Sequence, residues 1–113
     1  MANSFVNKKV DLTSTAATVL YTVPDASTAI IKSILVSEDS GNADTITVTI
    51  TDTSDDVFSL FKTKSISANA TTELLTAPLV LQQKEVLKVT AATANRLHVI
   101  LSALESKPRE VTT

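Results

Sequence analysis

The segment Thr45-Ile46-Thr47-Val48-Thr49-Ile50-Thr51 decides the fold class of this chain. Threonine occupies every odd position and a β-branched aliphatic residue every even one. Because successive side chains of a β-strand point to opposite faces of the sheet, this period predicts a strand with one hydrophilic face and one apolar face. Thr, Val and Ile are also better strand formers than helix formers, so composition and period agree.

Similar segments occur on both sides of this strand. We expect further strands at residues 6–12, 19–23, 29–37, 57–62, 86–91 and 97–104, and a short one from residue 72. Residues 79–81 are interpreted as an apolar anchor beside a turn. About eight short strands without a helical window predict an all-β chain, either a single antiparallel β-sandwich (jelly-roll-like or immunoglobulin-like) or a small barrel. Of these, the sandwich is our prediction.

The turns must form almost without glycine, because the chain has a single one, Gly41. Chain reversals are expected at residues 25–27, 39–42, 53–56, 68–71, 82–85 and 93–95. Asn and Asp tolerate the left-handed backbone region and can replace glycine there. We therefore predict loops of about three to five residues built on type I turns.

The length of 113 residues indicates one domain. We divide the chain into an N-terminal arm or first strand (residues 1–12), the sandwich (13–105) and a polar C-terminal tail (106–113). No signal peptide is expected, because no apolar stretch follows the polar N-terminus. No membrane span is expected either, since the most apolar run, residues 29–36, is interrupted by Lys32 and Ser33.

The composition excludes several kinds of site. The chain has no Cys, one His, one Gly and a formal net charge of −2. Disulfides, cysteine-based metal sites, histidine metal clusters and glycine-rich phosphate loops are thereby excluded. A mildly acidic chain is also a poor nucleic-acid binder. We expect no cofactor, no metal ion and no nucleic-acid or membrane partner.

Acidic residues gather between residues 33 and 61, where there is no Lys or Arg. Oxygen-rich loops are what Ca²⁺ requires. However, Glu38, Asp39 and Asp44 precede the threonine-rich strand and residues 52–56 follow it, a separation of roughly 23 Å. Solvated turns are therefore favoured over a weak cation site. Every Asp and Glu is predicted to lie in a turn or on the surface.

His98 is the one candidate acid or base with a neutral ordinary pKa. The sequence places no carboxylate beside it and offers no nucleophile at a recognisable spacing. We interpret His98 as a surface or packing residue and predict no catalytic residues. An enzyme is the least favoured class of function.

Both ends of the chain carry the best candidates for partner contact. Basic residues there could pair with an acidic surface. Apolar residues there could pack in a first strand of the same sandwich, or could dock on a neighbouring subunit, because sheet edges readily add strands. The predicted contact residues are Phe5, Val6, Lys8, Lys9, Lys107, Arg109 and Val111.

An ordered set of motifs carries a family resemblance. It begins with Val19-Leu20-Tyr21-Thr22-Val23-Pro24 and the apolar segment 28–37, and continues with the threonine-rich strand. Pro78-Leu79-Val80-Leu81, Leu87-Lys88-Val89-Thr90-Ala91 and Ser102-Ala103-Leu104-Glu105 follow. The set resembles small structural proteins of tailed bacteriophages, especially of marine and cyanobacterial hosts. The family's usual Gly-Asp turn is replaced here by Gln83-Lys84-Glu85.

The resemblance implies a β-sandwich component of the virion, made in the host cytoplasm and carrying no catalytic residues. A capsid decoration or cement protein that bridges shell subunits is the first choice, with a neck, tail or baseplate component as the alternative. The implied partners are the major capsid protein or other virion proteins, with many copies or a homo-oligomer per particle. A carbohydrate-binding module is the alternative from another class, disfavoured because the four aromatic residues fall mostly in core-patterned strands.

Overall fold

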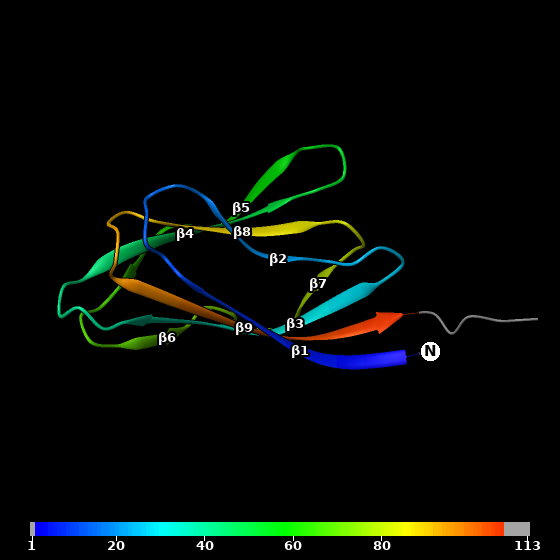
Figure 1. The fold of residues 1–113 in the computed structure, drawn as a ribbon, viewed down its shortest axis with the longest axis horizontal. Helices are drawn as coiled ribbons and strands as arrows, with labels where there is room; N and C mark the ends of the chain where they lie inside the picture. The colour runs from blue at the N-terminus through cyan, green and yellow to red at the C-terminus, as the bar shows by residue number, and fades with distance from the viewer. Residues whose placement is uncertain (1, 108–113) are drawn as a thin grey trace, which may run out of the picture.

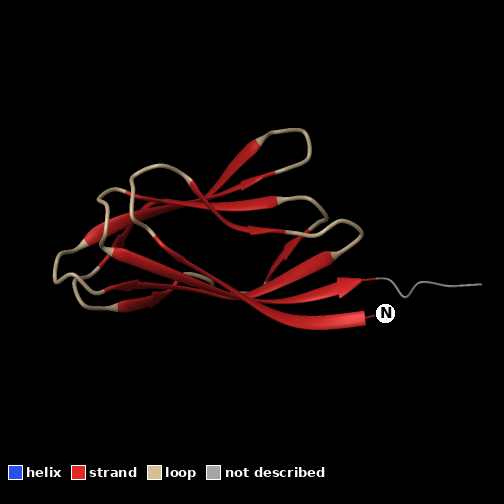
Figure 2. Cartoon of the chain, in the orientation of Figure 1, coloured by secondary structure: helices blue, strands red, loops and turns tan. Residues whose placement is uncertain are grey.

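The computed structural model describes residues 2–107, and these form an all-β domain in which no helix occurs (Figure 2). The strands are β1 (Ala2–Asp11), β2 (Thr18–Thr22), β3 (Thr28–Glu38), β4 (Asp44–Thr51), β5 (Val57–Ile66), β6 (Thr71–Glu73), β7 (Leu79–Leu81), β8 (Val86–Ala91) and β9 (Leu97–Lys107).

Two antiparallel sheets face each other (Figure 1). Sheet A has the order β1-β9-β3-β6, with β7 also paired to β3, and sheet B has the order β2-β8-β4-β5. β6 pairs with residues 35–37 of β3 and β7 with residues 29–31, so the two short strands act as one interrupted edge strand. With β6 and β7 counted together, each sheet has four strand positions, and the two strand orders are those of a jelly roll. The predicted β-sandwich is confirmed.

The core lies between the sheets and follows the predicted alternation. Ile46 and Val48 of β4 are fully buried, while the threonines that alternate with them lie on the outer face of sheet B. On β9, the alternate residues from Leu97 to Ala103 are buried in the same way. Apolar side chains from both sheets thus pack in one layer, as expected for a sandwich.

Strand β3 changes the phase of its alternation in mid-strand. Ile31 pairs with Ala103 and Ser33 pairs with Ser102, so Lys32 is an extra residue without a position in the register. Such a β-bulge shifts which residues face inward. Residues 29 and 31 are buried before the bulge and residues 34, 36 and 38 after it. This explains why the sequence of β3 looks apolar on both faces.

The predicted reversals are where the backbone turns. A positive φ is found at Ala26, Gly41, Asp55, Asn69, Lys84 and Asn95, all within predicted turns, and at Thr63 inside β5. The turn from Asp52 to Asp55 has a positive φ only at its last residue, Asp55, and therefore fits the predicted type I geometry. The turns at 24–27, 67–70 and 82–85 instead have the positive φ at their third residue, which defines type II, so the type I prediction is wrong there.

Several strands have other bounds than predicted, among them β5, which continues beyond residue 62 to Ile66. Residues 79–81 form strand β7, because they pair with β3, and are not merely an anchor. β1 starts at Ala2 and pairs with β9 along its whole length. Of the two alternatives for this part of the chain, an arm or a first strand, residues 2–11 therefore form a first strand. β9 extends to Lys107, so Ser106 and Lys107 belong to the sheet and not to a tail. The rest of the predicted tail, residues 108–113, lies outside the described residues.

The phase change in β3 predicts unequal effects of two neighbouring substitutions. Ile34→Ala should lower the free energy of unfolding by about 2–5 kcal/mol, because it leaves a cavity in the core. Leu35→Ala should cost only about 1 kcal/mol, because that side chain lies on the outer face of sheet A. Urea denaturation measures both. Equal losses would contradict the bulge at Lys32.

Candidate interaction surface

The outer face of sheet A, turned away from sheet B, carries a continuous apolar row. Phe5 of β1 pairs with Leu104 of β9, Leu104 with Ile30 of β3, and Ile30 with Val80 of β7. Residues in direct register share a face, so the four side chains lie side by side across the sheet. Phe5 is 81% exposed and Val80 53% exposed. Large apolar side chains grouped on a surface are typical of contact sites.

A second row crosses the same face and has opposite charges at its ends. Lys9 pairs with Ile100, Ile100 with Leu35, and Leu35 with Glu73. The carboxylate of Glu73 accepts hydrogen bonds from the hydroxyl of Ser33 and from the backbone N–H of Ile34, the latter at 2.8 Å. These bonds hold the negative charge in place. The row is therefore apolar in its middle, positive at β1 and negative at β6.

Polar residues separate the two apolar rows. Asn7, Ser102 and Ser33 lie in register between them. A shallow groove of about 400 Å³ runs beside the second row, between β1, β9 and β3. It is lined by Lys9, Val10, Asp11, Ser37, His98, Val99 and Ile100.

The outer face of sheet B differs from this surface. The threonines of β4 cover it, joined by Lys88 and Thr90 of β8. Val19 of β2 is an apolar side chain exposed there, at 52%, and its register partner is Lys88. Apolar rows thus occur on the face of sheet A, and a threonine-rich surface on that of sheet B.

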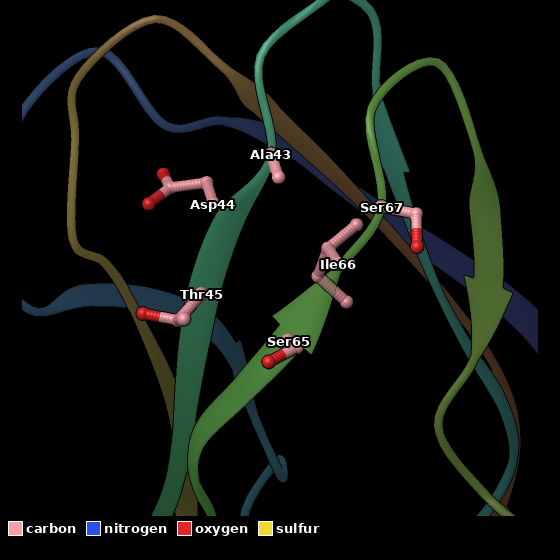
Figure 3. A pocket seen from close by; sticks show the side chains of 6 residues that line it. All are labelled: Ala43, Asp44, Thr45, Ser65, Ile66 and Ser67. Atoms are coloured by element: carbon pink, nitrogen blue, oxygen red, sulfur yellow. The ribbon is translucent and has the colours of Figure 1, made fainter.

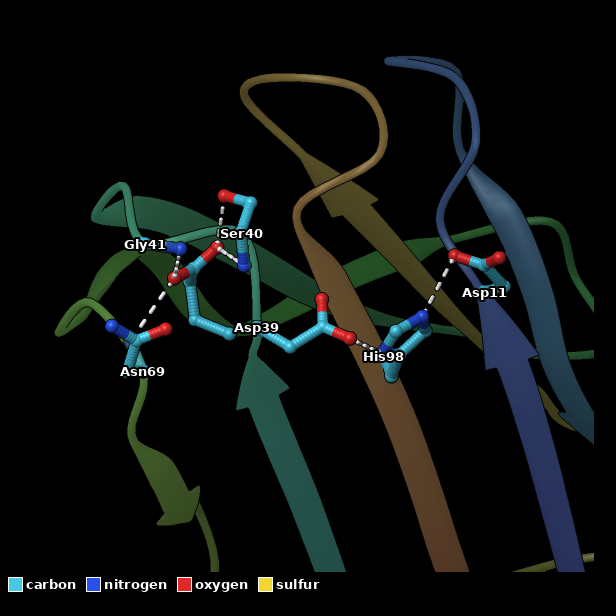
Figure 4. Close-up of polar contacts among 7 residues, drawn as sticks. Asp11, Asp39, Ser40, Gly41, Asn69 and His98 are labelled. Atoms are coloured by element: carbon cyan, nitrogen blue, oxygen red, sulfur yellow. Dashed lines mark hydrogen bonds and ion pairs between the residues drawn. The ribbon is translucent and has the colours of Figure 1, made fainter.

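His98 lies at the end of the sheet A face, between two carboxylates (Figure 4). Its Nε2 is 3.2 Å from Oδ1 of Asp11, and its Nδ1 is 3.5 Å from Oδ2 of Asp39. These partners could not be predicted from local sequence, because they come from β1 and from the turn after β3. The three side chains connect β1, β9 and that turn, and all are substantially exposed, so water screens the attraction between them.

Glu38 is the clearest correction to the sequence analysis, because it is 1% exposed rather than a surface residue. Its Oε2 accepts hydrogen bonds from the backbone N–H and hydroxyl of Ser40, and its Oε1 from the N–H groups of Gly41 (3.1 Å) and Asn69 (3.0 Å) (Figure 4). Burial alone would raise its pKa. These hydrogen bonds outweigh burial and lower the pKa from 4.5 to about 2. One carboxylate therefore fixes the turns that follow β3 and β5.

Asp44 is a second buried carboxylate that the sequence analysis placed at the surface. Its Oδ2 accepts a hydrogen bond from the N–H of Thr93, at 3.1 Å, in the turn between β8 and β9. A shallow cavity of about 230 Å³ lies beside it, between β4 and β5 (Figure 3). Figure 3 shows the carboxylate pointing away from Ile66 and Ser67 on the other side of this cavity, so no charge is aimed into it.

The two groups of acidic residues are separated as expected, since strand β4 runs between them. Asp52 uses its Oδ1 to accept hydrogen bonds from the N–H groups of Ser54 and Asp56, which closes its own turn. Within residues 2–107, no three His, Asp or Glu side chains are grouped in a way suited to a metal ion. The same residues contain no helix able to span a membrane.

A hydrogen bond between Tyr21 and Glu105 links the two sheets and is not predicted by the sequence pattern. The hydroxyl of Tyr21 on β2 donates a 2.5 Å hydrogen bond to Oε2 of Glu105 on β9. Burial, followed by the hydrogen bond and the negative charge of Glu105, raises the pKa of the tyrosine. This bond joins the two sheets near the end of β9.

The predicted contact residues fall in different places. Phe5 and Lys9 lie on the outer face of sheet A, whereas Val6 packs partly against the core. Lys8 is on the same side of β1 as Val6 but remains exposed, and Lys107 ends β9. Arg109 and Val111 lie outside the described residues.

The prediction that the aromatic residues mostly belong to the core is wrong. Tyr21 is buried, but Phe5 and Phe58 are exposed and Phe61 is only partly buried. The two exposed rings lie on different sheets, Phe5 on β1 and Phe58 on β5. They therefore do not form one stacking platform of the kind sugars bind.

Comparisons with known proteins give one weak structural similarity and no sequence match. Neither a protein-family model nor a curated protein matches the sequence. Among solved structures, a chain from the disulfide-linked pili of Bacillus endospore appendages is similar, with a TM-score of 0.49 and 13% sequence identity. The match covers 93% of this chain and 88% of that chain.

The carboxylate of Glu38 makes stability depend on pH. Because its pKa is lower in the folded state, its stabilisation is fully present above about pH 4.5 and is lost as the pH falls through about 2. Glu38→Gln should be less stable than the wild type at neutral pH, and the difference in free energy of unfolding should shrink below about pH 5. Urea denaturation across this range measures it. Asp56→Asn removes the same charge from an exposed turn and is the matched control for the loss of one carboxylate.

Proposed function

We propose that the protein is a non-enzymatic structural component of a tailed-phage virion, and specifically a capsid decoration protein that binds the shell through the free edge of β1. The free edge of β1 means the side of Ala2–Asp11 that faces away from β9. The observation that carries the proposal is the length and regularity of this edge. The family resemblance supplies the virion as its setting.

The four sheet edges are not equally open to pairing. β2 has five residues and a bulge, β5 has two register shifts, and β6 and β7 have three residues each with Pro78 between them. Short, bulged and interrupted edges are the usual protection against unwanted pairing. β1, by contrast, has ten residues in one uninterrupted register with β9. It is the edge best suited to accept a strand from another protein.

The charge of β1 indicates what kind of strand would fit. Lys8 and Lys9 are adjacent and exposed, so one points to each side of the sheet. An acidic strand would neutralise both, whereas a basic strand would be repelled. Attachment at one edge is weak, but repetition over many sites on a shell would raise the total stabilisation.

The same edge would serve a neck, tail or baseplate component. Copy number separates the two roles. Quantitative mass spectrometry of purified particles should give a copy number close to that of the major capsid protein for a decoration protein, and far lower for a neck or tail component. Absence from the particles would refute the proposal as a whole.

Reversal of one charge tests the edge itself. Lys8→Glu should lower occupancy on particles about tenfold at low salt, with a smaller loss at high salt, because exposed charges are screened. Lys62→Glu, the same change on edge strand β5, should leave occupancy unchanged. Titration of fluorescent protein onto particles stripped of it measures both. Equal behaviour of the two variants would exclude the β1 edge.

A further inference from the structure

We propose that the outer face of sheet A binds the same face of a second copy of this chain, across a twofold axis parallel to the strands. This contact does not use the unpaired backbone edge of β1, although Lys9 contributes its charge to both surfaces. It concerns side chains that point out of the sheet, not unpaired backbone groups at its side.

The order of residues across the face is complementary to itself. A twofold axis along the strands, passing between β9 and β3, places β1 of one copy over β6 and β7 of the other. Lys9 then lies opposite Glu73 of the second copy, and Glu73 opposite Lys9 of that copy. The surface is complementary to itself in charge, as a twofold interface must be.

The apolar residues match under the same operation. Phe5 meets Val80 of the second copy, and Leu104 meets its Ile30. In the second row Ile100 meets Leu35. The serines of the polar row also meet each other. Apolar rows are thus covered by apolar rows, which removes the exposed surface of Phe5, Val80 and Ile100 from water.

The other face-to-face arrangement is less favourable. A twofold axis perpendicular to the strands would exchange the two rows. Glu73, whose carboxylate is held by backbone N–H groups of its own chain, would then lie against the apolar Val80. Burying a charge without an opposite charge is costly, so the axis parallel to the strands is preferred.

The size of the face is sufficient for a modest interface. From Asn3 to Asp11, across four strands, it measures roughly 26 Å by 19 Å, or about 500 Å² on each copy. Two copies would cover about 1,000 Å², the lower limit for specific association. We therefore expect reversible association that depends on concentration.

Cysteine cross-linking tests the axis, because the chain has no cysteine of its own. Across the proposed axis two copies of residue 100 are roughly 11 Å apart and two copies of residue 7 roughly 17 Å. A short bismaleimide should therefore link Ile100→Cys into dimers and leave Asn7→Cys monomeric. The perpendicular axis would reverse this result, since it brings residue 7 over itself.

Dimers of Ile100→Cys alone support the proposal. Dimers of Asn7→Cys alone, equal linking of both, or no linking of either would overturn it. Thermal unfolding checks that the variants are folded, and Leu35→Cys, equally near the axis, replaces Ile100→Cys if that variant is not.

Sedimentation of the cysteine-free chain gives an independent measurement. Val80→Asp should raise the dimer dissociation constant at least tenfold. Val19→Asp introduces the same charge on sheet B at nearly the same exposure and should not change it. A wild type that stays monomeric at all concentrations would refute self-association. If the wild type then still occupied particles, the proposed virion role would survive without it.

Discussion

The surface of this sandwich depends on one backbone irregularity, the bulge at Lys32 in the central strand of sheet A. The extra residue reverses which side chains of β3 face the core. Ile34 therefore enters the core, Leu35 joins the outer face, and Glu38 is carried into the interior. A regular strand would have placed Leu35 inside and left Glu38 in solvent, so both the apolar rows and the loop network follow from this bulge.

The buried carboxylate of Glu38 is a consequence of that phase change and organises one end of the molecule. It receives hydrogen bonds from turns that lie on either side of β4 and β5 in the sequence. A chain with a single glycine must place other residues at a positive φ, which costs even Asn some energy, and Asn69 is one of these residues. Hydrogen bonds from the backbone of these turns to a fixed charge compensate for that cost.

Much of the fold could be predicted because it depends on local pattern. The alternation from Thr45 to Thr51 predicts a half-buried strand, and the Asn, Asp and Ser clusters predict where the chain reverses. The surface could not be predicted in the same way. The rows Phe5-Leu104-Ile30-Val80 and Lys9-Ile100-Leu35-Glu73 join strands that are far apart in sequence, and their order depends on a register that no local pattern contains.

The sequence by itself determined the strands, most of the turns and the β-sandwich class, because period, propensity and turn chemistry act over a few residues. Tertiary structure alone decided the jelly-roll order, the burial of Glu38 and Asp44, the carboxylates beside His98 and the difference between the two outer faces. The physical reason is that strand pairing joins residues tens of positions apart, and a shift of one residue in register moves every side chain to the opposite face.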